Sequence, residues 1–300
     1  MSVELVEPFP EPLADEEVEQ RLRAGAWQRL LHEPSALVGG TIVAAVVLLA
    51  LVAVVWTPYD PLAQDYAHVL APMSWSHPFG TDEFGRDVLS RLMGGAKLVL
   101  FSGAVSVAIA VAAGVPIGLA SAMRGGVVGD LLMRVVDLVY AFPALLAAIV
   151  LAAALGASTF TAMVAIGIAY IPVFARVTRS SALQVVGSEY VLAARAYRRS
   201  GPAIVVRHVL PNIRAILIVQ SSLLFSLAIL AEAGLSYLGL GTPDPDPSWG
   251  RMVQEAQDTL SRDPMLAFWP GIFIALAVLG FNLLGDGLRD VLDPRLRSSR

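Results

Sequence analysis

The chain has 300 residues, of which 56% are hydrophobic and only 15% are charged, and its net charge is -4. Because soluble domains usually carry about 25% charged residues, this composition indicates an integral membrane protein. The absence of cysteine excludes disulfides, thiol catalysis and cysteine-ligated metals. The four histidines are scattered and form no HExxH-like pair, so we also predict no metal site.

Long apolar runs predict six membrane spans, since a helix needs about 20 mostly apolar residues to cross a bilayer. The runs cover residues 37–56, 98–123, 138–175, 215–240 and 264–285. The third run is long enough for two spans, joined by a tight turn around residues 156–159. We therefore expect an all-α integral membrane protein with six transmembrane helices.

The chain divides into four parts around these spans. Residues 1–36 form an acidic tail, which we predict to be solvated and largely disordered or interfacial, although binding of a regulator by the tail stays open. Residues 37–56 form the first membrane anchor and residues 57–97 an extracytoplasmic connection. Residues 98–297 form the core domain with five spans and a basic segment at 188–212.

The distribution of arginine predicts the orientation in the membrane, because basic connections stay in the cytoplasm. The connection between the fourth and fifth spans carries seven arginines between residues 176 and 214 but only one acid, Glu189. The connection between the last two spans is acidic instead. With six spans, the basic connection and both termini are expected on the cytoplasmic side.

No signature of an enzyme is present, and we assign no catalytic residue. The only lysine, Lys97, lies outside any glycine-rich phosphate loop, and the chain has no GxxxxGK[ST] motif. The protein therefore cannot bind ATP in the manner of a P-loop. If it uses the energy of ATP, a partner must hydrolyse the nucleotide.

Polar residues and prolines within the spans are candidates for gating or helix packing. Asp137 shares a helix face with Asp130 and Arg134, which indicates an ion-paired helix end. Glu232 is expected near the outer end of the fifth span. A proton carrier would need a second acid at that depth, so hydrogen bonding between helices is the better interpretation, and Asn282 is interpreted in the same way.

Small residues and prolines mark how the spans are expected to pack and bend. Gly114 and Gly118 have the spacing of a surface on which two helices approach closely. Pro116, Pro143 and Pro172 interrupt three successive predicted spans. Kinked spans suit a pathway that opens and closes, although static membrane helices also contain proline.

The basic segment from Glu189 to Asn212 predicts a short helix, a turn at residues 200–202 and a second short helical stretch. Ala193 and Ala194 leave room for a partner surface, and the surrounding arginines supply directional polar contacts. An interfacial helix with arginines on anionic lipid headgroups has the same composition. The residues alone leave both interpretations open.

The same segment resembles the EAA loop of ABC-importer permeases, with Ala193-Ala194 and Leu210-Pro211 at the family's separation. Two further blocks resemble the C-type subunit of the dipeptide/oligopeptide permease family. The first is HPFGTDEFGRDVLSR at residues 77–91. The second comprises EAGLSYLGLG at 232–241, PSWGRM at 247–252 and NLLGDGLRDVLDPR at 282–295. The resemblance covers roughly residues 36–297.

The resemblance implies a non-catalytic subunit with the type I ABC-importer permease fold in a prokaryotic plasma (inner) membrane. Its implied partners are a second, B-type permease, two cytoplasmic ATPase domains that bind ATP and Mg, an extracytoplasmic solute-binding protein, a peptide substrate and lipid, with no nucleic acid and no cofactor of its own. The EAA loop is implied to be a coupling helix seated in an ATPase groove. The residues implied in coupling are Glu189, Ala193, Ala194, Arg195, Arg198, Gly201, Leu210 and Pro211.

Two positions depart from the family pattern, and other substrates stay open. Leu192 stands where Glu is usual and Arg198 where glycine is usual, while a glycine follows later at Gly201. Permeases of the same family import nickel chelates, glutathione or haem as well as peptides. A secondary transporter driven by protons, with Glu232 as carrier, is the alternative of a different class.

Overall fold

The computed structural model describes residues 30–292, in which regular structure is helical apart from one isolated β-bridge between Thr81 and Asp87. Most of the predicted acidic tail and the arginines beyond residue 292 lie outside the described residues. The elements in chain order are α2 (Pro34–Val55), the 3-10 turn η1 (Tyr66–His68), α3 (Val88–Arg124), α4 (Gly126–Tyr140), α5 (Ala144–Leu155), α6 (Thr159–Val186), α7 (Glu189–Ala196), α8 (Gly201–Ile204), the π turn η2 (Val205–Val209), α9 (Leu210–Tyr237), α10 (Trp249–Glu255) and α11 (Met265–Leu292).

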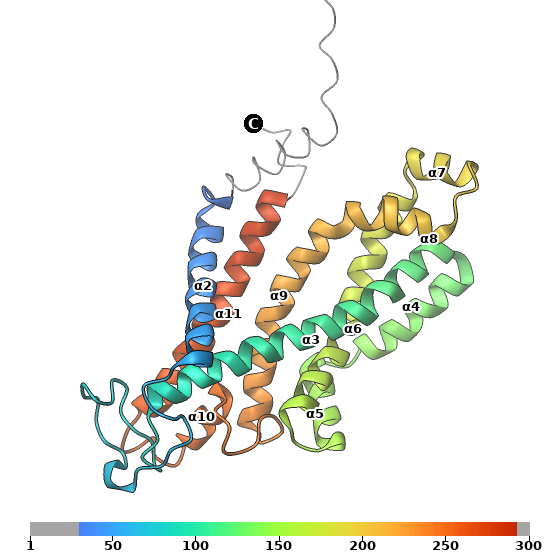
Figure 1. The fold of residues 1–300 in the computed structure, drawn as a ribbon. Helices are drawn as coiled ribbons and strands as arrows, with labels where there is room; N and C mark the ends of the chain where they lie inside the picture. Colours follow the sequence, from blue (N-terminus) through green and yellow to red (C-terminus); the bar gives the residue numbers. More distant parts are fainter. Residues whose placement is uncertain (1–29, 293–300) are drawn as a thin grey trace, which may run out of the picture.

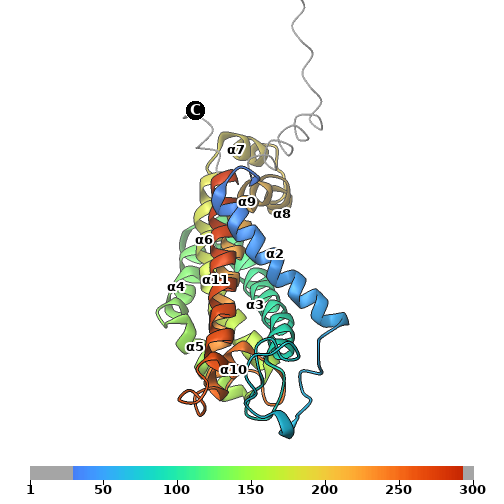
Figure 2. The same ribbon diagram turned by 90° about the vertical axis from the view of Figure 1, so that its left-hand side faces the viewer.

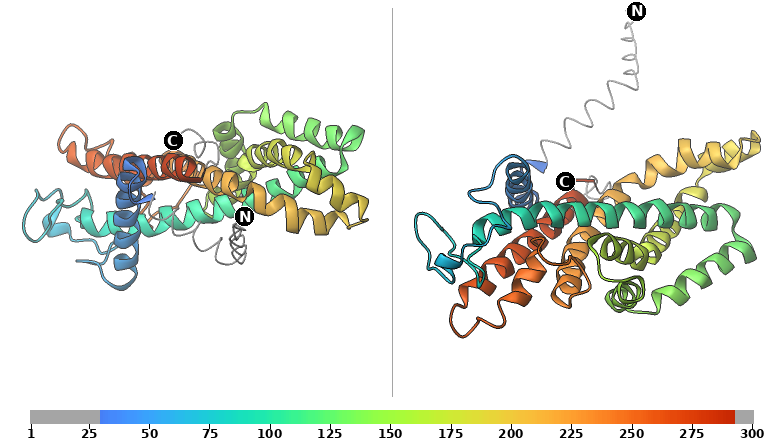
Figure 3. Two further views of the ribbon diagram at one scale, coloured as in Figure 1. Left: turned by 90° about the horizontal axis from the view of Figure 1, so that it is seen from above. Right: turned by 60° about the horizontal axis from the view of Figure 1, so that its bottom comes forward.

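The long helices run between two ends of an elongated bundle (Figure 1). At one end, α7 and α8 project beyond the other helices, and this is called the α7 end. At the other end lie α10 and the connection from residue 57 to residue 87, and this is called the α10 end. α2 packs on α11, α3 packs along α6, and α9 contacts α3, α6 and α11 (Figures 2 and 3).

Five helical segments are long and apolar enough to cross a membrane: Pro34–Val55, Val88–Arg124, Thr159–Val186, Gly201–Tyr237 and Met265–Leu292. α4 and α5 pass the same test only as a pair, which is bent by 79° at the break between them. The described chain therefore has five such spans, or up to six if the bent pair counts as one. The predicted turn at residues 156–159 is confirmed, because α5 ends at Leu155 and α6 begins at Thr159.

The bent pair corrects the expected third span, which the sequence placed as one helix from residue 138, interrupted by Pro143. α4 begins at Gly126 and ends at Tyr140, and Pro143 directly precedes α5. Proline lacks the N–H that would continue the hydrogen-bond ladder and disfavours helical geometry at Phe142 before it. The helix therefore ends and restarts in a new direction. By contrast, α3 and α6 continue through Pro116 and Pro172, so those prolines do not end their spans.

α3 begins at Val88, ten residues before the expected start of the second span, so the expected connection 57–97 is shorter in the structure. Asp87 caps the helix, because its carboxylate accepts hydrogen bonds from the Ser90 backbone N–H and hydroxyl at 2.8 and 2.7 Å. The expected start was placed after the charged residues Arg91 and Lys97. Arg91 is buried in ion pairs, however, and does not interrupt the helix.

The predicted packing surface at Gly114 and Gly118 is confirmed between α3 and α6. A Cβ atom added at Gly114 would lie 2.5 Å from Cβ of Phe174, and one at Gly118 would lie 2.5 Å from the carbonyl oxygen of Ala175. Both distances are too short for any side chain. Glycine therefore sets the close approach of these two helices, as is usual where small residues mediate helix association in lipid.

Candidate functional site

The basic segment folds as an exposed short helix at the α7 end. Val191 and Ala194 are buried against the bundle, while Leu192, Ala193 and Tyr197 face outward. The expectation that both alanines leave room for a partner is therefore wrong for Ala194, whose side chain packs inside the chain's own core. The outward face of α7 combines one small residue with exposed aliphatic and aromatic side chains.

The cations around α7 are exposed and available to a partner. Four arginine side chains reach solvent in this segment, and the described part of the chain offers none of them a carboxylate within 4.0 Å: Arg195, Arg198, Arg199 and Arg207. Glu189 opens the helix, where a negative charge is favourable to the helix dipole. The surface at the α7 end is thus basic and unpaired.

Arg198 holds a backbone conformation that suits glycine. Its φ angle is +53°, and its N–H donates to the carbonyl of Arg195 at 2.9 Å. A side chain is strained in this left-handed region, where glycine is the usual residue after a helix. The turn therefore keeps the geometry of the glycine that the family pattern has at this position. Gly201 does not replace that glycine, because it begins α8.

Leu210 and Pro211 lie inside one continuous helical run from Gly201 to Tyr237, which is 37 residues long. The expected second short helix is therefore the beginning of the span itself. The π turn at residues 205–209 precedes the proline, and Leu210 N–H bonds to the carbonyl of Val205. This local widening of the helix accommodates the missing N–H of Pro211 without a break.

Glu232 is buried near the α10 end, with 1% of its surface exposed. Its Oε1 accepts hydrogen bonds from the hydroxyls of Ser236 at 2.7 Å and Ser248 at 3.0 Å. Ser248 precedes α10, so the hydrogen bond from Ser248 joins α9 to the loop before α10. The sequence had suggested a hydrogen bond to a neighbouring span instead. Oε2 has no partner within the described residues.

The other polar residues expected in packing bridge long helices. Asp130 and Asp137 on α4 pair with Arg179 and Arg176 on α6, at 2.7 and 3.8 Å, and not with Arg134 as expected from their shared helix face. The partners lie on α6 because α4 packs against that helix. On the opposite side, Asn282 Oδ1 of α11 accepts a hydrogen bond of 2.8 Å from Ser226 of α9.

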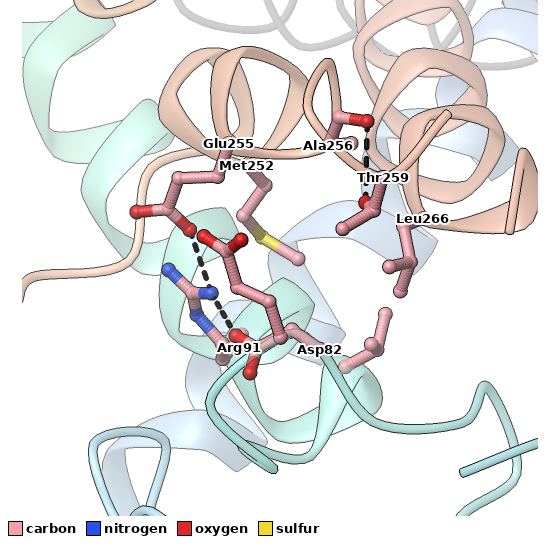
Figure 4. Close-up of a pocket in the computed structure, with 9 residues that line it drawn as sticks. Asp82, Arg91, Met252, Glu255, Ala256, Thr259 and Leu266 are labelled. Atoms are coloured by element: carbon pink, nitrogen blue, oxygen red, sulfur yellow. Dashed lines mark hydrogen bonds and ion pairs between the residues drawn. The ribbon is translucent and has the colours of Figure 1, made fainter. Parts of the chain in front are cut away.

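A buried cluster of four charges at the α10 end was not predicted, and Figure 4 shows three of its members, Asp82, Arg91 and Glu255. Arg86 donates to Asp82 at 2.6 Å and to Glu255 at 3.0 Å, and Arg91 bonds to the same two carboxylates. Both arginines are about 1% exposed. Three of these residues lie in the block at 77–91, but nothing in the sequence indicated that Glu255 would complete the cluster. A cavity of about 20 Å³ beside Arg91 has room for about one water molecule.

These features define a multi-span helical membrane protein with a basic helical projection at one end. An inward-facing structure of the MetNI methionine ABC transporter has the same fold, with a TM-score of 0.56 at 16% identity over 67% of this chain and 96% of that chain. Residues 114–298 match the family described as binding-protein-dependent transport system inner membrane component, and residues 22–72 match the N-terminal TM domain of oligopeptide transport permease C. The chain belongs to this family of inner-membrane permeases.

Three relatives have similar lengths and high coverage. The di/tripeptide permease DppC of Pseudomonas aeruginosa is 40% identical over 91% of this chain and 92% of its own length. The dipeptide permease DppC of Alkalihalophilus pseudofirmus is 37% identical over 96% of both chains. The oligopeptide permease OppC of Bacillus subtilis is 36% identical over 91% of this chain and 89% of its own. The family resemblance inferred from three sequence blocks is therefore confirmed.

Proposed function

We propose that this chain is one of two permease subunits in an ATP-driven importer of short peptides. A second permease, two cytoplasmic ATPase domains that bind ATP and Mg, and an extracytoplasmic solute-binding protein complete the complex. Similarity to di/tripeptide, dipeptide and oligopeptide permeases along nearly the whole chain supports the substrate class. The unpaired arginines at the α7 end support a cytoplasmic position for that end.

The observation that carries the coupling role is the exposed helix α7. The outward face of α7 carries the small side chain of Ala193 between those of Leu192 and Tyr197. A groove of an ATPase domain can therefore approach the helix closely at Ala193. The neighbouring unpaired arginines suit carboxylates on the rim of such a groove. We favour an ATPase over lipid headgroups as the partner of α7, because binding to lipid does not require an exposed turn with a strained backbone at Arg198.

Motion at α7 has a direct mechanical route across the membrane. A turn of four residues, 197–200, joins α7 to the helical run that starts at Gly201 and ends at Tyr237. At 1.5 Å per residue this run is about 55 Å long, which exceeds the thickness of the bilayer. ATPase closure would displace α7, and the continuous helix would carry that displacement to Glu232 and the segments around it at the α10 end.

Glutathione is a second candidate substrate, because the glutathione permease GsiD of Pectobacterium atrosepticum is 36% identical over 91% of this chain. A proton-driven mechanism has less support. Glu232 is held by two serine hydroxyls at the end of α9, and Asp130 and Asp137 of α4 pair with arginines. The remaining acids of the spans, Asp286 and Asp290, both lie in the last two turns of α11. This leaves no series of carboxylates through the membrane.

The test is transport by the purified complex. The chain should co-purify with an ATPase and a second permease. Vesicles reconstituted with this complex and its solute-binding protein should accumulate radiolabelled alanine peptides of two to five residues only when ATP is supplied on the ATPase side. Accumulation driven by a proton gradient without ATP would overturn the proposal. Accumulation of glutathione but of none of the alanine peptides would favour the second candidate.

A further inference from the structure

A cavity of about 560 Å³ opens between α6, α9 and α11 in the half of the bundle nearer the α7 end. Its volume falls within the range of about 300–1,000 Å³ that is usual for small-ligand sites. The cavity is lined by aliphatic residues and by six polar ones: Ser180, Ser181, Gln184, Asn212, Gln220 and Arg289. The polar residues come from all three helices, so a ligand within the cavity would meet polar groups on several sides.

The charge of the lining is distinctive. No acid lines the cavity within the described residues, and Arg289 in the last turn of α11 is its one cation. Gln184, Gln220 and Arg289 have no hydrogen-bond partner within the described chain. Asn212 uses its amide N–H to reach the carbonyl of His208 at 2.6 Å, which leaves its oxygen as an acceptor. The cavity therefore offers free carboxamides and one free guanidinium.

A carboxamide carries the same donor and acceptor groups as a peptide bond, and it pairs with a peptide bond whatever the neighbouring side chains are. A guanidinium in turn binds a carboxylate through two parallel hydrogen bonds. Together these groups match the features that every unmodified peptide shares, namely amide groups along the chain and a terminal carboxylate. The aliphatic part of the lining adds no charge that would select among side chains.

We propose that this cavity binds the main chain of a short peptide, with peptide groups on Gln184 and Gln220 and the C-terminal carboxylate on Arg289. The proposal rests on the peptide-import function above. Gln220 lies eight residues beyond Asn212, or about 12 Å along α9. An extended peptide rises about 3.3–3.6 Å per residue, so three to four residues span the distance from Gln220 to Asn212. The carboxylate leads toward the α7 end.

Site-specific photocrosslinking in the reconstituted complex tests the occupant of the cavity. Benzoylphenylalanine at position 216 should label radiolabelled dialanine, trialanine or tetraalanine during ATP-driven uptake, because Ile216 lines the cavity one helical turn from Gln220. Position 279 is the control, because Leu279 is exposed on α11 and does not line the cavity. We expect at least about fivefold more peptide label at 216 than at 279, since an ordered contact with Gln220 places the peptide beside position 216. Equal labelling, or labelling of the second permease or of lipid alone at 216, overturns the inference.

The same vesicles separate this inference from the proposed function. If ATP-driven peptide uptake persists without peptide labelling at 216, the site is wrong and the importer function stands. If no alanine peptide is taken up with ATP, the proposed function fails and the inference fails with it.

Arg289 is tested by its own substitutions. Arg289→Gln should lower the turnover of trialanine uptake about tenfold, the size expected for loss of one charged hydrogen-bonded contact. The concentration of solute-binding protein at half-maximal uptake should not change. Arg289→Lys should restore part of the rate, whereas Arg262→Gln, an exposed control at the α10 end, should have no effect. Uptake by Arg289→Gln within twofold of the unmodified complex would contradict the carboxylate contact.

Discussion

Arg91 on α3 donates a hydrogen bond of 2.9 Å to Glu255 at the end of α10, although 164 residues separate them in the chain. The Arg91 side chain is 2% exposed and that of Glu255 is 13% exposed. With Asp82 and Arg86, the pair fastens the start of α3 to the segment between the last two spans. The α10 end is therefore held together by buried charges as well as by apolar packing around Trp249.

Arg91→Ala should destabilise the protein by about 3–5 kcal/mol, because removal of one partner leaves buried carboxylates without full compensation. The midpoint of thermal unfolding in detergent measures the effect. Arg251→Ala is the matched control, since Arg251 contacts the same Glu255 at 3.3 Å but its side chain is 23% exposed. A decrease in the Arg251 variant as large as in the Arg91 variant would contradict the role of burial.

Glu83 should make the stability of the α10 end depend on pH. Its partial burial raises the pKa of the carboxyl, and the negative charges of Glu255, Asp82 and Asp258 raise it further. A raised pKa in the folded state means that the protonated form stabilises the fold. That contribution is complete below the unfolded pKa and is lost as pH rises through the folded pKa.

Glu83→Gln should therefore raise the unfolding midpoint at pH 7 more than at pH 4, where Glu83 itself is largely neutral. Thermal unfolding of both proteins across this range measures the difference. Glu83→Asp keeps the titrating carboxyl and should follow the unmodified protein. A difference between Gln and Glu that grows toward low pH would show that the sign is wrong.

Two substitutions at Arg198 separate its backbone from its side chain. Both Arg198→Gly and Arg198→Ala remove the guanidinium, but only glycine relieves the left-handed strain, which costs about 1 kcal/mol. We expect both variants to insert and assemble normally and to change ATP hydrolysis stimulated by loaded solute-binding protein. Only the glycine variant should also protect the 197–200 turn from proteolysis. Unchanged coupling and unchanged complex yield in both variants would remove the proposed role of Arg198.

Gly118→Val should weaken the contact of α3 with α6, because its side chain would meet the backbone of Ala175. Overpacking of this kind typically costs about 1–3 kcal/mol. Gly271→Val is the control, since a Cβ at Gly271 on α11 would find no atom within 4 Å among the described residues. The unfolding midpoint of each variant in detergent gives the comparison. Equal effects of the two substitutions would mean that helix propensity, and not packing, dominates.

Hydropathy predicted most spans, because the cost of charge in hydrocarbon leaves a clear local pattern. It misplaced the start of α3, since a buried and paired Arg91 looks like a solvated charge in the sequence. Pro143 marked where the third span is interrupted, but the 79° bend between α4 and α5 could not be predicted, because Phe142-Pro143 sits in an uninterrupted apolar run.

Contacts between segments far apart in the chain could not be predicted from the sequence. Asp82 lies in a recognisable block and Glu255 lies outside all of them, and only the folded chain brings both to the same two arginines. The exposed α7 was predicted as a helix, but which alanine faces outward depends on how α7 packs on the bundle. The sequence analysis noted that Arg198 stands where glycine is usual. The positive φ angle at Arg198 agrees with this, because the turn still requires the left-handed backbone conformation that glycine adopts without strain.

The most direct test of the coupling mechanism uses the absence of native cysteine. Ala193→Cys carries a photoactivatable maleimide crosslinker on the outward face of α7, and Ser74→Cys carries it on the opposite, α10 end of the molecule. After illumination of the intact complex, we expect a product of this chain with the ATPase from position 193 and none from position 74. A product with the ATPase from position 74 but not from position 193 would show that α7 is not the ATPase-coupling helix.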